Sequence, residues 1–302
     1  MSSIPRAGNV AVVGAGLMGT GIAHAFVAAG HAVTLVDVSA PALAKAADSV
    51  GAILADGVRR SKVTAADAEA ARARLATSSD LAVALRKRPV DLLIETVSEA
   101  LEVKIAIVRE AGRHLPDQAL IATNTSALSV TKIAAATGRA DRTVGMHFFN
   151  PVHKMKLLEI VRGATTSDET VTRARAWGES LGKTSIVVNE SPGLTTSRMS
   201  ALMGNEAMYM LMEGVASAED IDTALRLGFN HPMGPLELGD LTGWDTRLAV
   251  LRYLHSTLGE RFSPCPLIAK LVNAGRTGRK AGKGVYDYVD GIRVPGSDPG
   301  IR

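Results

Sequence analysis

The sequence NVAVVGAGLMG, Asn9 to Gly19, joins a short β-branched run to three glycines. The β-branched run is typical of a buried parallel strand. Gly14, Gly16 and Gly19 have the G-x-G-x-x-G spacing, in which glycine permits a tight turn, lets the backbone approach a pyrophosphate and brings the next helix close to the strand. A helix is predicted from about Met18 to Ala29, and its first N–H groups would face the anion. We therefore expect a strand, a phosphate-binding loop and a helix, in that order.

The next predicted strand, HAVTLVD, ends in a carboxylate, Asp37, which follows Gly16 by 21 residues. A carboxylate at this position can hydrogen-bond an adenosine ribose and repels a 2′-phosphate. Val38 and Ser39 follow it without an arginine, so the sequence favours NAD over NADP. The alternative is a glycine-rich turn beside an unrelated aspartate. The predicted cofactor contacts in this part of the chain are Gly14, Gly16, Leu17, Met18, Gly19 and Asp37.

The bulk composition excludes several classes of protein. Of the 302 residues 46% are hydrophobic and 21% charged, which is ordinary for a soluble globular protein. The net charge of +4 and the 4% of aromatic residues argue against a nucleic-acid module. The single cysteine, Cys265, rules out an internal disulfide, suits a reducing cytoplasm and is interpreted as structural. No apolar run has membrane-spanning length and the N-terminus is too short and polar for a secretory signal, so we expect a cytoplasmic protein without a membrane segment.

Strands and helices alternate along the first two thirds of the chain. A long helical region is predicted for Pro41–Arg74. The further predicted strands are Asp91–Val97, Ala119–Thr125, Thr143–Phe149, Leu157–Val161 and Thr184–Asn189. This alternation predicts an α/β fold, a mainly parallel sheet with helices on both faces. Ligands bind such sheets beyond the carboxyl ends of the strands.

The pattern changes at Ser191, after which the sequence is helical as far as about Val272. We therefore predict a Rossmann-type dinucleotide-binding domain over residues 1–190 and an all-α C-terminal domain for substrate binding and dimerisation over residues 191–302. The last stretch, from Val294, is predicted to be disordered.

The segment GMHFFNPVHKMKLLEIV, Gly145 to Val161, places two histidines and a glutamate in apolar surroundings. Such groups are costly to bury unpaired, so they either pair or perform chemistry. This segment, together with GAGLMG, NTSAL (Asn124 to Leu128), HPMGPLEL and GRKAGKGVYDY, resembles the 3-hydroxyacyl-CoA dehydrogenases over nearly the whole chain.

The resemblance implies that His147 is a general base paired with Glu159. Oxidation of a secondary alcohol needs a base with a pKa near neutrality, and a carboxylate on the second ring nitrogen stabilises the imidazolium. The two residues lie in consecutive apolar strands, so they can face each other. The alternative for His147 is a hydrogen-bonded core histidine, whereas His153 is expected at the rim of the substrate site or in solvent.

Further residues match family positions. Ser126 and Asn150 match residues that contact substrate and nicotinamide and can donate to a developing oxyanion. Glu99, Lys104 and Lys280 match cofactor contacts, although a plain surface lysine is an equal alternative for Lys104 and Lys280.

The chain departs from the family at Ser197, where asparagine is usual after the PGF turn. A serine hydroxyl donates a hydrogen bond with shorter reach. Ser197 either holds the same catalytic network or marks a shift toward another acyl group, and we favour the first.

The coenzyme A carrier is polyanionic, and Arg59, Arg60 and Lys62 lie in the region where the family binds it. The alternative is a solvated helix face. The resemblance also implies a homodimer formed through the C-terminal helical domain. No metal site is predicted.

The leading interpretation is NAD-dependent oxidation of L-3-hydroxyacyl-CoA, with 3-hydroxybutyryl-CoA as the expected substrate. The same scaffold could act on 3-hydroxyadipyl-CoA, a carrier-protein-bound hydroxyacyl group or a free hydroxy acid such as carnitine or gulonate. Arg198 is the candidate for binding the second carboxylate of a diacid. A non-catalytic NAD-binding protein is the alternative from another class.

Overall fold

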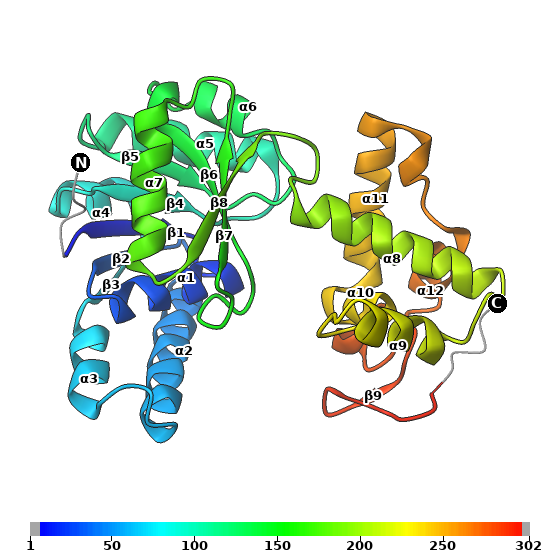
Figure 1. The fold of residues 1–302 in the computed structure, drawn as a ribbon. Helices are drawn as coiled ribbons and strands as arrows, with labels where there is room; N and C mark the ends of the chain where they lie inside the picture. The colour runs from blue at the N-terminus through cyan, green and yellow to red at the C-terminus, as the bar shows by residue number, and fades with distance from the viewer. Residues whose placement is uncertain (1–6, 298–302) are drawn as a thin grey trace. The chain divides into compact units, whose positions relative to one another are not determined.

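A computed structural model describes residues 7–297 of the chain (Figure 1). The chain divides into two compact units, Met1–Ser191 and Pro192–Arg302. Each unit has its own apolar core. Within the described residues, none of the helices is long and apolar enough to cross a bilayer.

An eight-stranded sheet forms the centre of the first unit. Its strands are β1 (Asn9–Val13), β2 (Ala32–Val36), β3 (Leu75–Ser78), β4 (Leu92–Glu95), β5 (Leu120–Thr123), β6 (Thr143–Phe148), β7 (Leu157–Arg162) and β8 (Thr184–Asn189). The spatial order is β3-β2-β1-β4-β5-β6-β7-β8. All neighbouring pairs are parallel except β6 and β7. The predicted α/β fold with a mainly parallel sheet is therefore confirmed.

The helices of the first unit lie on both faces of this sheet (Figure 1). They are α1 (Leu17–Ala28), α2 (Ala40–Arg59), α3 (Ala65–Ala73), α4 (Leu81–Lys87), α5 (Leu101–His114), α6 (Val130–Ala135) and α7 (Asp168–Ser180), with a short 3₁₀ turn, η1 (Ala140–Arg142). Alternate side chains of β1 point to opposite faces of the sheet. Val10 and Val12 pack with α1, α2 and α7, whereas Ala11 and Val13 pack with α4, α5 and α6.

The segment between β2 and β4 differs from the prediction of one helical region. It holds two helices, because α2 ends at Arg59 and the Thr64 side chain caps α3 by accepting from the Asp67 N–H. The following strand β3 was not predicted. It is a four-residue edge strand whose side chains are exposed or half-buried, so it lacks the apolar run that marks the other strands.

The second unit is helical and ends in a small hairpin. It contains α8 (Thr196–Met212), α9 (Ala218–Gly228), α10 (Pro235–Thr242), α11 (Trp244–Leu258) and α12 (Pro266–Asn273), the 3₁₀ turns η2 (Glu260–Phe262) and η3 (Arg279–Ala281), and the strands β9 (Tyr288–Val289) and β10 (Ile292–Arg293). The two-stranded hairpin is an addition to the predicted all-α domain.

A buried carboxylate ties the C-terminal segment to the helices of the second unit. Asp240 accepts hydrogen bonds from the Trp244 indole at 2.6 Å and from the N–H groups of Val285 and Tyr286 at 2.7 and 2.8 Å. Cys265 is also fully buried, and burial raises the pKa of its thiol. These contacts agree with the interpretation of Cys265 as structural.

The predicted disorder from Val294 is wrong for the first four residues. The Val294 N–H donates to the carbonyl of Asp287, and the Ser297 hydroxyl accepts from the Asp287 N–H. Residues 298–302 lie outside the described part of the chain.

Candidate active site

The glycine loop between β1 and α1 has the geometry that its sequence predicts. Gly14 has a φ of +106°, in the left-handed region that favours glycine. A Cβ on Gly19 would overlap the Gly14 carbonyl and press on the Thr96 hydroxyl, so α1 can approach β1 only if residue 19 is glycine. A Cβ on Gly16 would meet no heavy atom within 4 Å. The space in front of Gly16 is therefore open for a phosphate group.

Asp37 lies directly beside this loop. One carboxylate oxygen accepts from the Ala15 N–H at 2.8 Å, and the other accepts from the Ser39 N–H at 2.9 Å. Because a carboxylate has about four lone-pair positions, it can still accept from ribose hydroxyls. The side chain of Leu17 is 71% exposed, whereas that of Met18 is half-buried and packs against the core.

His147 and Glu159 face each other as predicted. The antiparallel register of β6 and β7 sets them directly opposite, with 2.7 Å between His147 Nδ1 and Glu159 Oε2. Both residues are buried. Pairing through Nδ1 directs the proton of the neutral ring to that nitrogen and leaves Nε2 as an acceptor. The hydrogen bond to Glu159 is common to the paired base and to the alternative of a hydrogen-bonded core histidine.

Four parallel strands bring the predicted residues to one edge of the sheet. β1, β4, β5 and β6 all run in the same direction. The glycine loop, Glu99, Ser126 and His147 therefore lie at or beyond the carboxyl ends of neighbouring strands. This is the edge at which open α/β sheets bind ligands.

Ser126 is held by Glu99. Glu99 Oε1 accepts from the Thr125 hydroxyl at 2.5 Å and from the Ser126 N–H at 2.9 Å. Burial alone would raise the pKa of Glu99, but the Thr125 hydrogen bond and the charge of Lys104 outweigh it and hold the pKa below its ordinary value. Glu99 is therefore an anion that orders the turn after β5.

Lys104 is not a plain surface lysine, which was the alternative interpretation of the sequence, because its side chain is only 1% exposed. Its ammonium lies 2.9 Å from Glu95 Oε1 and 3.3 Å from Glu99 Oε2. The ammonium is therefore enclosed by these two carboxylates.

A groove of about 460 Å³ lies between α1, α2 and the loop after β6. Asn150 and His153 line it from the loop, and Gly16 and Leu17 line it from the glycine loop and the start of α1. His153 is exposed, as expected for a rim residue. Neither His147 nor Ser126 is among the residues that line this groove.

The predicted basic cluster at the end of α2 is partly neutralised. Arg59 and Arg60 both pair with Asp56, at 2.8 and 2.7 Å. Lys62 follows in the exposed turn before α3. The two arginines therefore present less free charge than the sequence suggests.

The remaining predicted residues belong to the second unit. Ser197 lies half-buried in the first turn of α8, and the Arg198 guanidinium lies 5.7 Å from the centre of the Phe262 ring. Lys280 is a surface residue whose ammonium pairs with Asp245 at 2.6 Å. Within residues 7–297 no three His, Cys, Asp or Glu side chains gather in a possible metal site.

Comparison with known families matches both units. Residues 9–191 match the NAD-binding domain of 3-hydroxyacyl-CoA dehydrogenase, and residues 193–288 match the C-terminal domain of the same enzyme. The chain belongs to the 3-hydroxyacyl-CoA dehydrogenase family. The resemblance read from the sequence motifs is therefore confirmed.

Individual relatives are similar over almost the whole chain. A probable 3-hydroxybutyryl-CoA dehydrogenase of Bacillus subtilis is 41% identical over 93% of this chain and 97% of its own. The crystal structure of (S)-3-hydroxybutyryl-CoA dehydrogenase from Ralstonia eutropha has a TM-score of 0.89 and 42% identity, over 93% of this chain and 99% of that one. The 3-hydroxyadipyl-CoA dehydrogenase of Escherichia coli is also 42% identical, over 93% of this chain and 59% of its own.

Sequence reasoning missed two residues of this dehydrogenase fold that organise the site. Glu95 binds Lys104 and accepts from the Thr123 hydroxyl at 2.7 Å, while Thr125 orients Glu99. A signal for Glu95 was present, because it is a carboxylate inside the apolar run DLLIETV. Thr125 has no such signal, since a threonine at a strand end is ordinary.

Proposed function

We propose that this chain is an NAD-dependent dehydrogenase that oxidises L-3-hydroxyacyl-CoA to 3-ketoacyl-CoA, with 3-hydroxybutyryl-CoA as substrate. The observation that carries the proposal is the buried pair of His147 and Glu159, 2.7 Å apart at the ligand-binding edge of the sheet. Family membership supports the same reaction. A non-catalytic NAD-binding protein would have no need to bury a titratable pair at this edge.

His147 is the general base of the proposed reaction. Its Nε2 accepts the proton of the substrate hydroxyl, and the hydride leaves the carbon that carries this hydroxyl. The Glu159 carboxylate holds the Nδ1–H tautomer and stabilises the imidazolium that forms. In the reverse direction the imidazolium returns the proton to the developing alkoxide.

The glycine loop and Asp37 fit NAD. The open space at Gly16 and the N-terminus of α1 suit a pyrophosphate, and Asp37 offers acceptors to the adenosine ribose. NAD supplies the acceptor for the hydride when it is bound. Ser126 and Asn150 donate hydrogen bonds to the substrate oxygen, and Glu99 and Lys104 order the turn that carries Ser126.

Relatives of equal similarity differ in the acyl group that they are named for. The hydroxybutyryl enzyme from Ralstonia eutropha and the hydroxyadipyl enzyme from Escherichia coli are both 42% identical to this chain. We propose the short acyl group because the Bacillus subtilis and Ralstonia eutropha relatives, matched over 97% and 99% of their own length, are named for it, whereas the Escherichia coli protein is matched over only 59% of its own.

The test is a spectrophotometric assay with NADH and acetoacetyl-CoA. Wild type should oxidise NADH rapidly. His147→Gln should lower kcat by about 10²–10⁴-fold, the usual contribution of a general base, and Glu159→Gln should lower kcat with little change in KM. Absence of turnover in wild type that still binds NADH would contradict the proposed substrate, and 3-ketoadipyl-CoA, carrier-bound and free hydroxy acids would be tried next.

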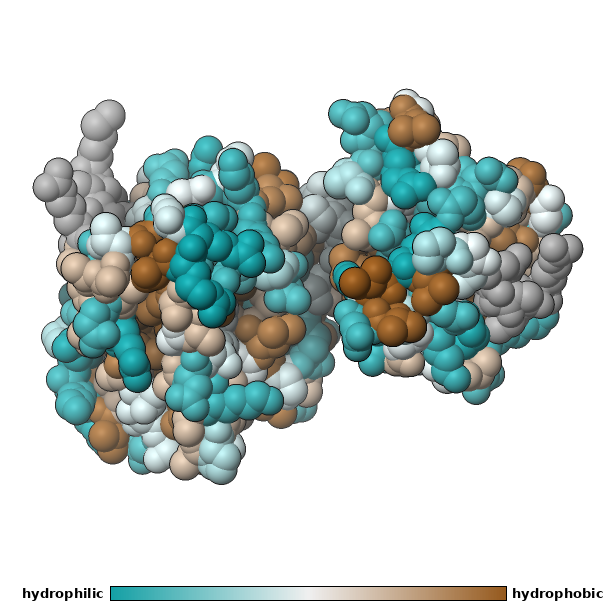
Figure 2. All heavy atoms as spheres, turned by 90° about the horizontal axis from the view of Figure 1, so that it is seen from below, coloured by the Kyte–Doolittle hydropathy of each residue, from teal (hydrophilic) through white to brown (hydrophobic). Residues whose placement is uncertain are grey.

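The proposed enzyme is a cytoplasmic homodimer. The lone buried cysteine suits a reducing compartment. Large apolar side chains are exposed on the second unit, among them Leu227 at 81% and Phe229 at 72%, and Figure 2 shows hydrophobic side chains gathered on one face of this unit. A second copy of the chain would cover such a surface.

A further inference from the structure

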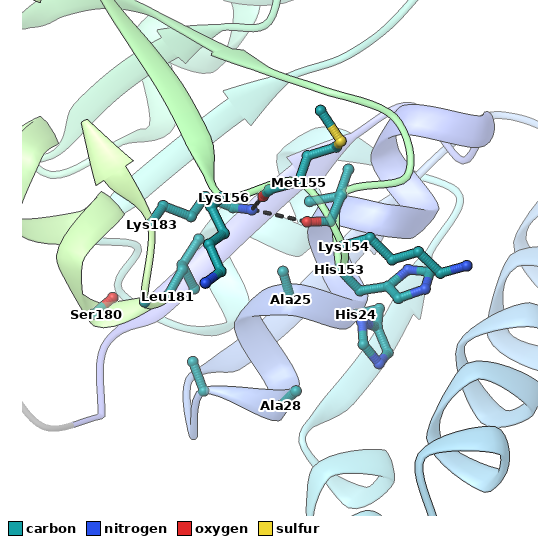
Figure 3. A pocket seen from close by; sticks show the side chains of 13 residues that line it. His24, Ala25, Ala28, His153, Lys154, Met155, Lys156, Ser180, Leu181 and Lys183 are labelled. Atoms are coloured by element: carbon teal, nitrogen blue, oxygen red, sulfur yellow. Dashed lines mark hydrogen bonds between the residues drawn. The ribbon is translucent and has the colours of Figure 1, made fainter. Parts of the chain in front are cut away.

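A buried lysine binds the loop that joins the two strands of the proposed catalytic pair. Lys183 lies in the turn between α7 and β8 and is only 9% exposed. Its ammonium donates to the carbonyls of Val152 at 2.8 Å and Met155 at 2.7 Å, as the dashed lines of Figure 3 show. Both carbonyls belong to the loop between β6 and β7, which connects His147 to Glu159 along the chain. Lys183 therefore binds this connection and neither member of the pair.

No carboxylate compensates the charge of Lys183 in its cavity. The cavity has a volume of about 420 Å³, and none of its 13 lining residues, all within the described part of the chain, is acidic. The buried Nδ1 of His24, which also lines it, has no hydrogen-bond partner among the described residues. Burial lowers the pKa of Lys183, which indicates that its charge is poorly solvated. Its two hydrogen bonds to the loop are therefore strong, because they are charge-assisted and shielded from water.

The backbone that carries Lys183 is itself fixed to the sheet. The Lys183 N–H donates to the Gly178 carbonyl at 3.1 Å, and the N–H of the next residue, Thr184, donates to the Lys156 carbonyl at 2.8 Å. Thr184 begins β8, which pairs in parallel with β7. The ammonium therefore extends from a rigid position, and its hydrogen bonds restrict the loop.

The opposite side of the same loop packs against α1. Val152 is 2% exposed, and a Cβ on Gly21 would come within 2.9 Å of its side chain. Val152 is therefore held twice, through its side chain by α1 and through its carbonyl by Lys183. Asn150 lies two residues before Val152, and both line the groove that Gly16 also lines. The position of Asn150 relative to the glycine loop consequently depends on the position of Val152.

We propose that Lys183 is a positioning residue, whose ammonium fixes the loop between β6 and β7 and so holds Asn150 where it can donate to the substrate oxygen. This inference rests on the proposed function, which gives Asn150 and His147 their roles. The ammonium also lies 5.7 Å from the centre of the Phe148 ring, in the residue that follows His147. A lysine that only stabilised the fold would leave every folded molecule fully active.

The test uses Lys183→Met, which removes both hydrogen bonds and keeps an apolar chain of similar length. Activity is measured with NADH and acetoacetyl-CoA, and kcat is expressed per NADH-binding site, counted by fluorescence titration. The variant should lower kcat per site about tenfold, because displaced groups react slowly, and leave the Kd of NADH within about twofold. Lys156→Met is the matched control, since it removes a charge from an exposed position of the same cavity. Its kcat per site should stay within about twofold of wild type.

Two outcomes of these assays would overturn the proposal. Fewer NADH-binding sites with an unchanged kcat per site would show that Lys183 only stabilises the fold. An equal loss in Lys156→Met would assign the effect to charge in the cavity and not to the two hydrogen bonds. If Lys183→Met does not fold, Lys183→Gln takes its place, because its shorter amide can keep one hydrogen bond. Its kcat per site should lie at least about threefold below wild type, and equality with wild type would also overturn the proposal.

Hydrogen exchange tests the same restraint without turnover. The N–H groups of Lys154 and Met155 donate to the Pro151 carbonyl at 2.9 and 3.0 Å. In Lys183→Met these amides should exchange at least about threefold faster than in wild type, whereas those of β1 should not change. Unchanged exchange in the loop would overturn the proposal. Faster exchange in the variant of a protein whose wild type binds NADH without turnover would contradict the proposed reaction alone.

Discussion

At the scale of single residues, two carboxylates lie within apolar strands and differ only in their partners. Glu95 pairs with the ammonium of Lys104, whereas Glu159 pairs with the imidazole of His147, the type of side chain that serves as a general base in catalysis. The first pair is suited to holding a turn in place and the second to moving a proton. In the sequence the two glutamates look alike, because each is an acidic residue in a buried run.

The departure from the family pattern at Ser197 has a direct test. Ser197→Asn should change kcat/KM for acetoacetyl-CoA by less than about tenfold, or about 1.4 kcal/mol, because either side chain can donate the hydrogen bond. Steady-state kinetics on the purified variant measures this. Complete loss of activity in a folded variant would show that the serine serves a different network.

His24 should make the stability of the protein depend on pH. Burial first, and then the nearby His153, lower the pKa of His24 from its ordinary value of 6.5 to about 4 in the folded chain, so folding favours the neutral ring. The stabilisation is fully present above pH 6.5 and is lost as the pH falls toward 4, by an amount of up to about 3 kcal/mol.

Urea unfolding between pH 7 and 4, in phosphate-free buffer, measures this loss. His24→Gln cannot take up the proton, so the free energy of unfolding of the variant should fall less steeply than that of wild type. The carboxylates titrate in both proteins and cancel in the difference. If the free energies of unfolding of wild type and variant fell in parallel with pH, the lowered pKa of His24 would be refuted.

At the scale of elements, the reversal between β6 and β7 creates the pair of His147 and Glu159 that we propose to be catalytic. A parallel pairing would need a long crossover connection, whereas the short antiparallel return places residue 159 opposite residue 147. A slip of one residue would turn Glu159 to the other face of the sheet. The strand register is therefore as necessary for the proposed chemistry as the residues themselves.

The contact between β1 and α1 predicts different effects for two glycines. Gly19→Ala should lower the free energy of unfolding by about 1–3 kcal/mol and weaken NADH binding, because its Cβ would push α1 off the strand. Gly16→Ala should leave stability nearly unchanged and raise the Kd of NADH at least about tenfold, because its Cβ enters the open phosphate space.

Gly51→Ala is the matched control for this pair. It lies inside α2 with no atom within 4 Å of its Cβ. The substitution should stabilise the helix by about 0.5–1 kcal/mol without changing NADH affinity. Equal NADH affinities for wild type and Gly16→Ala would contradict the placement of the pyrophosphate.

The link between α5 and β4 depends on Lys104. Lys104→Met should lower the free energy of unfolding by about 3–5 kcal/mol, since it leaves Glu95 buried without its cation. Adding Glu95→Gln to this variant should recover part of the loss. If Lys104→Met alone were as stable as wild type in urea unfolding, the ion pair would contribute nothing to the free energy of unfolding.

At the scale of the whole molecule, the two units have separate cores and separate tasks in the proposed enzyme. The first carries the glycine loop and the proposed base, and the second carries Ser197, Lys280 and an exposed apolar surface. A light-scattering mass near twice the 31.5 kDa of one chain is expected. Leu227→Lys/Phe229→Lys should lower that mass toward one chain if these residues lie in the interface. A wild-type mass near one chain would contradict the dimer.

The sequence by itself determined whatever depends on neighbouring residues. Strand periodicity, the glycine spacing and the acid at the end of the second strand are local, so they predicted the α/β fold and the NAD loop, whereas the pairing of His147 with Glu159 was implied by the resemblance to the family. Only the tertiary structure decided what depends on distant residues. The burial of Lys104 against Glu95, the edge strand β3 and the orphan nitrogen of His24 arise from packing between segments far apart in the chain. Local patterns carry no record of such packing, because burial and register are properties of the assembled sheet and not of any one segment.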